Sequence, residues 1–83
     1  MKTVHEVRVP FTCVFRRWEK NGEPRNVKAN ENICIVAYFI MPGVTTNIKA
    51  GADGWLEIEK WIKGGDLLEI GTLIAKIHLS IPI

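Results

Sequence analysis

The chain has 83 residues and a formal net charge of +2, with 11 Lys and Arg against 9 Asp and Glu. This length fits one small domain and excludes a second, so most of the aliphatic and aromatic side chains must share one core. The weak charge argues against a nucleic-acid partner. No secretory h-region and no apolar window of bilayer length occurs, so we expect a cytoplasmic protein without a membrane partner.

Alternating and β-branched residues predict short strands along the whole chain. We expect these strands at 7–9, 13–18, 33–40, 44–48 and 55–62. Turn residues separate the strands. Asn21-Gly22 is typical of a hairpin, and Met41-Pro42-Gly43-Val44 has Pro and Gly where a type II turn needs them. Two further turns are expected at Ala52-Asp53-Gly54 and Gly64-Gly65-Asp66.

Two segments of the chain echo each other, Trp18-Glu19-Lys20-Asn21-Gly22-Glu23 and Trp61-Ile62-Lys63-Gly64-Gly65-Asp66. They lie 43 residues apart, while the apolar runs that follow, beginning at Ile33 and Ile74, lie 41 residues apart. An internal duplication with a two-residue slip in a loop explains both spacings. Gly22 and Gly65 would then occupy equivalent turns, and the tryptophans Trp18, Trp55 and Trp61 would be packing residues related by the repeat.

The repeat predicts how the domain is built. We expect two halves, at about 6–40 and 44–79, related by a pseudo-twofold axis. The fold class is therefore all-β, with two four-stranded antiparallel sheets forming a flattened barrel or sandwich. The chain crosses between the halves through a β-hairpin whose tip is Pro42-Gly43.

The stretch Gly65-Asp66-Leu67-Leu68-Glu69-Ile70-Gly71-Thr72-Leu73-Ile74-Ala75-Lys76-Ile77 is similar to a GDxVxxGxxLxxI signature. That signature is characteristic of the biotinyl/lipoyl attachment domain family, which the sequence resembles over about 6–77. Residues 47–54 resemble the strand and turn after the family's attachment site, and Val9-Pro10-Phe11-Thr12 resembles its opening strand. The resemblance implies the same barrel-sandwich fold.

In that family one lysine at the tip of the central hairpin carries biotin or lipoate. Gly43 falls on this position here, and residues 38–47 contain no lysine. The resemblance therefore implies a carrier fold without an attached cofactor, which is no enzyme and acts as a protein-binding or assembly module. Its partner would be a multi-enzyme complex or a second copy of the chain. The alternative is a genuine biotin or lipoyl carrier that is modified at Lys49.

Apolar residues replace the lysine and its surroundings. If the hairpin projects from the domain, these residues form a contact surface for the partner. Strand periodicity also allows a plainer interpretation, in which alternate members of the run face the core. The candidates for partner contact are Tyr38, Phe39, Ile40, Met41, Pro42 and Val44.

Nothing else in the sequence predicts catalysis or metal binding. His5 and His78 lie near opposite ends of the chain and become neighbours if the terminal strands pair, but a zinc site would still lack two ligands. Cys13 and Cys34 match neither zinc-ligand nor redox spacing, so we expect small buried strand residues. The tryptophans and the basic residues near them could form a nucleic-acid surface, which the low net charge disfavours.

Overall fold

The computed structural model describes residues 3–79. They form eight strands and one short 3-10 turn. The elements are β1 Val4–Arg8, β2 Cys13–Trp18, η1 Glu19–Gly22, β3 Asn26–Val27, β4 Asn32–Tyr38, β5 Thr45–Lys49, β6 Gly54–Ile58, β7 Leu67–Leu68 and β8 Leu73–Leu79.

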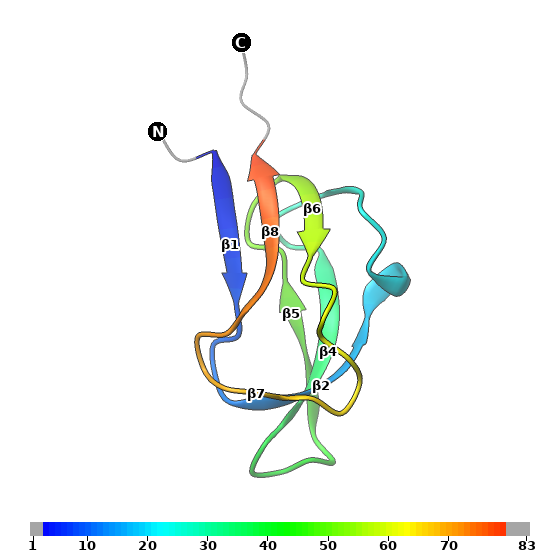
Figure 1. Cartoon of the computed structure of the whole chain (residues 1–83), viewed down its shortest axis with the longest axis vertical. Coiled ribbons are helices and arrows are strands. Elements are labelled where there is room, and N and C mark those ends of the chain that lie inside the picture. Colours follow the sequence, from blue (N-terminus) through cyan, green and yellow to red (C-terminus); the bar gives the residue numbers. More distant parts are fainter. Residues whose placement is uncertain (1–2, 80–83) are drawn as a thin grey trace.

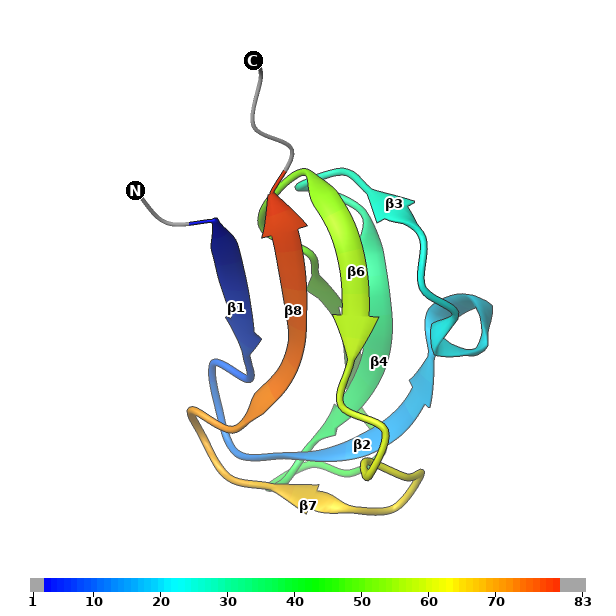
Figure 2. The same ribbon diagram turned by 45° about the horizontal axis from the view of Figure 1, so that its top comes forward.

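The strands form two antiparallel sheets of four (Figure 1). Sheet A has the order β1-β8-β6-β3 and sheet B the order β5-β4-β2-β7. The two sheets pack face to face around one core, with β1, β8 and β6 in front of β4 and β2 in Figure 2. The predicted all-β fold of two four-stranded sheets is confirmed. Along residues 3–79 no strand pairs between the sheets, so the fold is a sandwich and not a closed barrel.

The predicted pseudo-twofold relation is also confirmed. Exchanging each strand for its counterpart in the other half, β1 for β5, β8 for β4, β6 for β2 and β3 for β7, turns the strand order of sheet A into that of sheet B. Each strand of the first half begins 41 residues before its counterpart, in the pairs Val4 and Thr45, Cys13 and Gly54, Asn26 and Leu67, and Asn32 and Leu73. The core keeps the same spacing, in the buried pairs Val7 and Ile48, Val9 and Ala50, Phe15 and Leu56, Val27 and Leu68, Ile33 and Ile74, Cys34 and Ala75, and Val36 and Ile77.

The 43-residue spacing of the tryptophan segments is confined to a loop, so Trp18 and Trp61 are not equivalent positions. Trp18 ends β2 and packs on Phe15, with ring centroids 4.9 Å apart. Trp61 lies beyond Ile58, where β6 ends earlier than predicted, and it is exposed. Trp55 is exposed too, since the pleat that turns Leu56 inward turns Trp55 outward. The prediction that all three tryptophans are packing residues is therefore wrong for Trp55 and Trp61.

Two predicted turns differ in detail. Asn21 (φ 57°) and Gly22 (φ 70°) both have positive φ, as the two central residues of a type I′ turn do. This turn makes no hairpin, because it leads from β2 in sheet B to β3 in sheet A. The turn at Pro42-Gly43 is closed by the Val44 N–H, which donates to the Met41 carbonyl at 2.9 Å. Gly43 lacks the positive φ that a type II turn requires.

Cys13 and Cys34 lie in β2 and β4, where both thiols are free and buried. Burial raises the pKa of the Cys13 thiol, and it raises the pKa of the Cys34 thiol to about 12, because a thiolate would lose its hydration there. The nearby Cys13 thiol adds to the shift at Cys34. Both cysteines therefore act as small apolar core residues, as the sequence predicts.

Replacing Cys34 with alanine should change how stability depends on alkaline pH. The thiol ionises near 9.0 when the chain is unfolded and near 12 when it is folded. The wild type should therefore lose stability relative to Cys34→Ala as the pH rises through this interval, by up to about 1.4 kcal/mol per pH unit. Urea unfolding of both proteins from pH 8 to 11 measures the difference, and a difference that stays constant would contradict the buried placement.

Replacing Gly54 with alanine should weaken sheet A. A Cβ at Gly54 would run into the backbone carbonyl of His78 on the neighbouring strand β8. We expect Gly54→Ala to cost about 2 kcal/mol or more, because the two backbones must separate. Gly43→Ala is the matched control, since a Cβ at Gly43 meets nothing within 4 Å. Thermal unfolding compares the two variants, and equal midpoints would rule out the β6–β8 register.

Candidate functional site

The β4–β5 hairpin joins the two halves, as predicted. Val36 lies opposite Thr46, and the Tyr38 N–H donates to the Val44 carbonyl at 3.0 Å. Residues 39–44 form the tip beyond this bond. The tip projects from one end of the sandwich, and the start of β1 and the end of β8 lie at the other end (Figure 1). The hairpin is therefore left open to solvent by the rest of the domain.

Four large apolar side chains are exposed on this tip, and we call them the tip cluster. The exposed fractions are 55% for Phe39, 90% for Ile40, 57% for Met41 and 45% for Val44. Pro42 is exposed as well. If alternate residues faced the core, about half of the run would be buried, yet every residue from 39 to 44 is exposed. The plainer interpretation of the run is therefore wrong.

Tyr38 behaves differently from the other predicted contact residues. It is half-buried, and its ring stacks on Phe11 with centroids 4.8 Å apart and an interplanar angle of 15°. This stack attaches the base of the hairpin to the segment before β2. Arg16 adds a second attachment, because its Nη2 donates to the Pro42 carbonyl at 3.1 Å. Tyr38 and Arg16 thus support the tip, and Tyr38 is not part of its exposed group.

No lysine lies on the tip. Gly43 occupies the turn and is exposed. Lys49 ends β5 at the end of the strand away from the tip, where its Nζ donates to the Asn30 carbonyl at 3.1 Å and lies 3.4 Å from Asn32 Oδ1. A lysine held along the sheet in this way is poorly placed to enter a ligase pocket or to swing between active sites.

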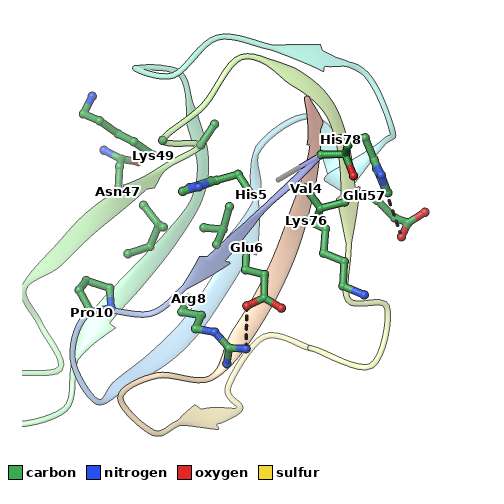
Figure 3. Close-up of a pocket in the computed structure, with 15 residues that line it drawn as sticks. Val4, His5, Glu6, Arg8, Pro10, Asn47, Lys49, Glu57, Lys76 and His78 are labelled. Carbon is green, nitrogen blue, oxygen red and sulfur yellow. Dashed lines mark hydrogen bonds and ion pairs between the residues drawn. The ribbon is translucent and has the colours of Figure 1, made fainter. Parts of the chain in front are cut away.

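A groove lies between the free edges of β1 and β5, which are pseudo-equivalent strands (Figure 3). Val7 and Ile48 line it and are nearly buried. The His5 ring reaches from β1 toward β5 and packs on Gly51, where an added Cβ would lie 2.8 Å from His5 Nε2. The groove is thus partly filled by the molecule's own imidazole.

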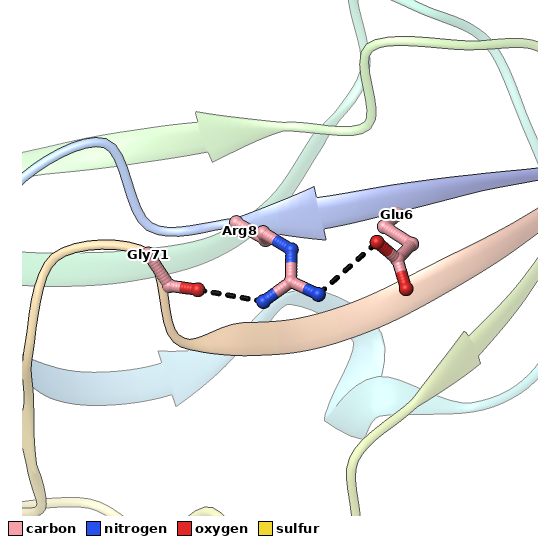
Figure 4. A network of polar contacts seen from close by, with 3 residues as sticks. All are labelled: Glu6, Arg8 and Gly71. Atoms are coloured by element: carbon pink, nitrogen blue, oxygen red, sulfur yellow. Dashed lines mark hydrogen bonds and ion pairs between the residues drawn. The ribbon is translucent and has the colours of Figure 1, made fainter.

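Arg8 lies at the end of β1 and makes two hydrogen bonds there. Its Nη1 donates to the Gly71 carbonyl at 2.8 Å, and its Nη2 donates to Glu6 Oε1 at 3.1 Å (Figure 4). The Gly71 N–H in turn donates to the Val9 carbonyl at 2.9 Å. These bonds tie β1 to the loop between β7 and β8, so we assign Arg8 a structural role.

The two histidines lie on neighbouring strands but on opposite faces of sheet A. His5 is opposite the buried Ile77 in the register of β1 and β8, whereas His78 is opposite Val4. The His78 Nε2 lies 3.7 Å from Glu57 Oε1 on the outer face. The prediction that the imidazoles become neighbours is therefore wrong. Within residues 3–79 no group of three or more His, Cys, Asp or Glu side chains is arranged to hold a metal ion.

The signature-like stretch 65–77 stabilises the fold and contributes nothing to the tip. Gly65 and Gly71 have positive φ, at 95° and 87°. Asp66 Oδ2 accepts a hydrogen bond from the Lys63 N–H at 2.8 Å and closes the turn before β7. The apolar signature positions are all buried in the core, namely Leu68, Ile74 and Ile77. The stretch therefore constrains architecture and does not by itself decide function.

Comparison with known proteins shows a similarity to a short segment of a WD repeat-containing protein. The chain is 28% identical over 68 residues to WD repeat-containing protein 19 of Homo sapiens, and equally to that of Mus musculus. The match covers 82% of this chain and 5% of each relative, so the chain spans about a twentieth of the length of these curated relatives. No protein-family model matches the chain, and no solved structure matches it. Over the described residues, 3–79, no helix is long and apolar enough to span a bilayer.

Substitution of Tyr38 should destabilise the domain much more than substitution of Ile40. Tyr38→Ala removes the stack on Phe11 and should destabilise the domain by about 1–3 kcal/mol. Ile40→Ser changes a side chain that is 90% exposed and should alter stability by less than about 0.5 kcal/mol. Urea unfolding of the two variants measures both effects. A large loss of stability for Ile40→Ser would place that side chain in the core and contradict the exposed tip.

Proposed function

We propose that this chain is a non-catalytic module of biotinyl/lipoyl-like fold that carries neither biotin nor lipoate. It binds a protein partner through the tip of the β4–β5 hairpin. The observation that carries this proposal is the tip cluster. It lies where the family resemblance puts the attachment lysine, and the sequence from 35 to 48 contains no charged residue.

Exposed apolar side chains that gather at one projecting point are typical of contact surfaces. Burial of one large apolar side chain contributes about 1.5–3 kcal/mol, so the tip cluster supplies several kcal/mol toward binding before the costs of association. The two supports at Tyr38 and Arg16 hold the hairpin in place beforehand, which lowers the entropy lost on binding.

Two further observations support this function. The similarity to a short segment of a WD repeat-containing protein fits a module that works in protein–protein contact within a larger assembly. The two free, buried thiols fit a reducing compartment, and we place the protein in the cytoplasm. A multi-enzyme complex is the partner that the family resemblance favours.

Co-expression with biotin and lipoate ligases should leave the intact mass of the protein unchanged, because no lysine lies on the tip. Intact-mass spectrometry of the purified protein measures this. A mass increase equal to one biotinyl or lipoyl group would overturn the proposal in favour of a working carrier. The matched variant Lys49→Arg would then show whether Lys49 is the modified residue.

A further inference from the structure

The two sheets are pseudo-equivalent, but their charges differ. The strands of sheet A contain two acidic and two basic residues, Glu6, Arg8, Glu57 and Lys76. The strands of sheet B contain three basic residues and no acidic one, Arg16, Arg17 and Lys49. Because the fold accepts the acidic Glu57 where sheet B has Arg17, it does not itself dictate a positive charge at that position.

The outer face of sheet B is apolar as well as basic. Phe15 and Val36 point into the core, so Val14 and Ile35 point to the outer side. Val14 lies between Leu67 of β7 and Ala37 of β4, and Leu67 is exposed. Arg17 lies opposite Ile35 on the same face. In sheet A the counterparts of Val14, Ile35, Leu67 and Arg17 are, in that order, Trp55, Lys76, Asn26 and Glu57.

This face continues into the hairpin tip. Ile35 and Ala37 alternate along β4 on the outer side, and Phe39 follows directly after the strand ends at Tyr38. Arg16 reaches the tip directly through its bond to the Pro42 carbonyl. The tip cluster is thus bordered on the β2 side by the guanidinium group of Arg16. Arg17, the next residue, lies opposite Ile35 farther from the tip, and both arginines are exposed.

We propose that the tip cluster and the outer face of sheet B form one docking surface for a protein segment with apolar side chains flanked by Asp or Glu. This inference rests on the proposed function and adds the chemistry of the partner. The apolar side chains of the segment cover the tip cluster and Leu67, and its carboxylates pair with Arg16 and Arg17. A basic segment would oppose like charges at the same place.

Selection from a phage library of random twelve-residue peptides tests this chemistry. The wild type is the bait, and peptides that also bind the double variant Ile40→Ser/Met41→Ser are discarded, because they do not need the tip. We expect the remaining peptides to combine apolar residues with Asp or Glu. Circular dichroism confirms that each variant is folded.

Two charge reversals at related positions then measure the electrostatic part. Arg17→Glu acts on sheet B, and Glu57→Lys is the matched control on sheet A. Arg17 lies opposite Ile35 and Glu57 lies opposite Lys76, and Ile35 and Lys76 are equivalent at the 41-residue spacing. For a selected peptide, Arg17→Glu should weaken binding by about fivefold or more, and added salt should reduce this difference. Glu57→Lys should leave the affinity within about twofold of the wild type.

The outcomes separate this inference from the proposed function. Peptides that depend on the tip but carry basic or neutral flanks would overturn the partner chemistry and leave the binding module in place. A selection that yields no tip-dependent peptide would overturn both. The wild type can also be sedimented with phosphatidylcholine–phosphatidylserine vesicles. If it cosediments and Ile40→Ser/Met41→Ser does not, the surface binds a membrane, and the proposed protein partner is overturned.

Discussion

The rest of the structure depends on the core that the two halves share. Each half supplies two strands to each sheet, so neither half can bury its apolar face without the other. Equivalent side chains such as Val7 and Ile48 meet in this one core. Inward positions are therefore constrained in both halves at the same spacing, while outward positions can diverge. The β4–β5 hairpin and the outer faces are where the halves differ, and the proposed function uses both.

Sequence patterns predict the architecture because the inward positions repeat. The strand alternation, the crossing hairpin and the pseudo-twofold relation all follow from that repeat and are confirmed. The wrong prediction that Trp18 and Trp61 are equivalent positions came from a local sequence similarity. The Glu23 N–H donates to the Lys20 carbonyl at 3.2 Å and the Asp66 N–H to the Lys63 carbonyl at 3.0 Å, so two similar turns do lie 43 residues apart. Turns form from neighbouring residues, whereas the position of a residue in the core is set by tertiary packing, which keeps the other spacing.

The candidate site divides in the same way. An apolar run such as 38–44 fits a buried strand and an exposed tip equally well, and only the end of pairing at Tyr38 and Val44 separates the two. The stack of Tyr38 on Phe11 joins residues that are distant in sequence, so no local signal predicts it. The charge difference between the sheets needs the strand order, because Arg17 and Glu57 become comparable only when the sheets are assembled.

Solvent paramagnetic relaxation of the isoleucine methyl groups tests the exposed hairpin tip most directly. A soluble gadolinium chelate relaxes methyl groups that water can reach, and one spectrum contains Ile40, the exposed reference Ile70 and the buried references Ile33 and Ile74. We expect the Ile40 methyl groups to relax at least as fast as those of Ile70 and far faster than those of Ile33 and Ile74. Relaxation of Ile40 as slow as that of the buried references would place the tip inside the domain and contradict a contact surface there.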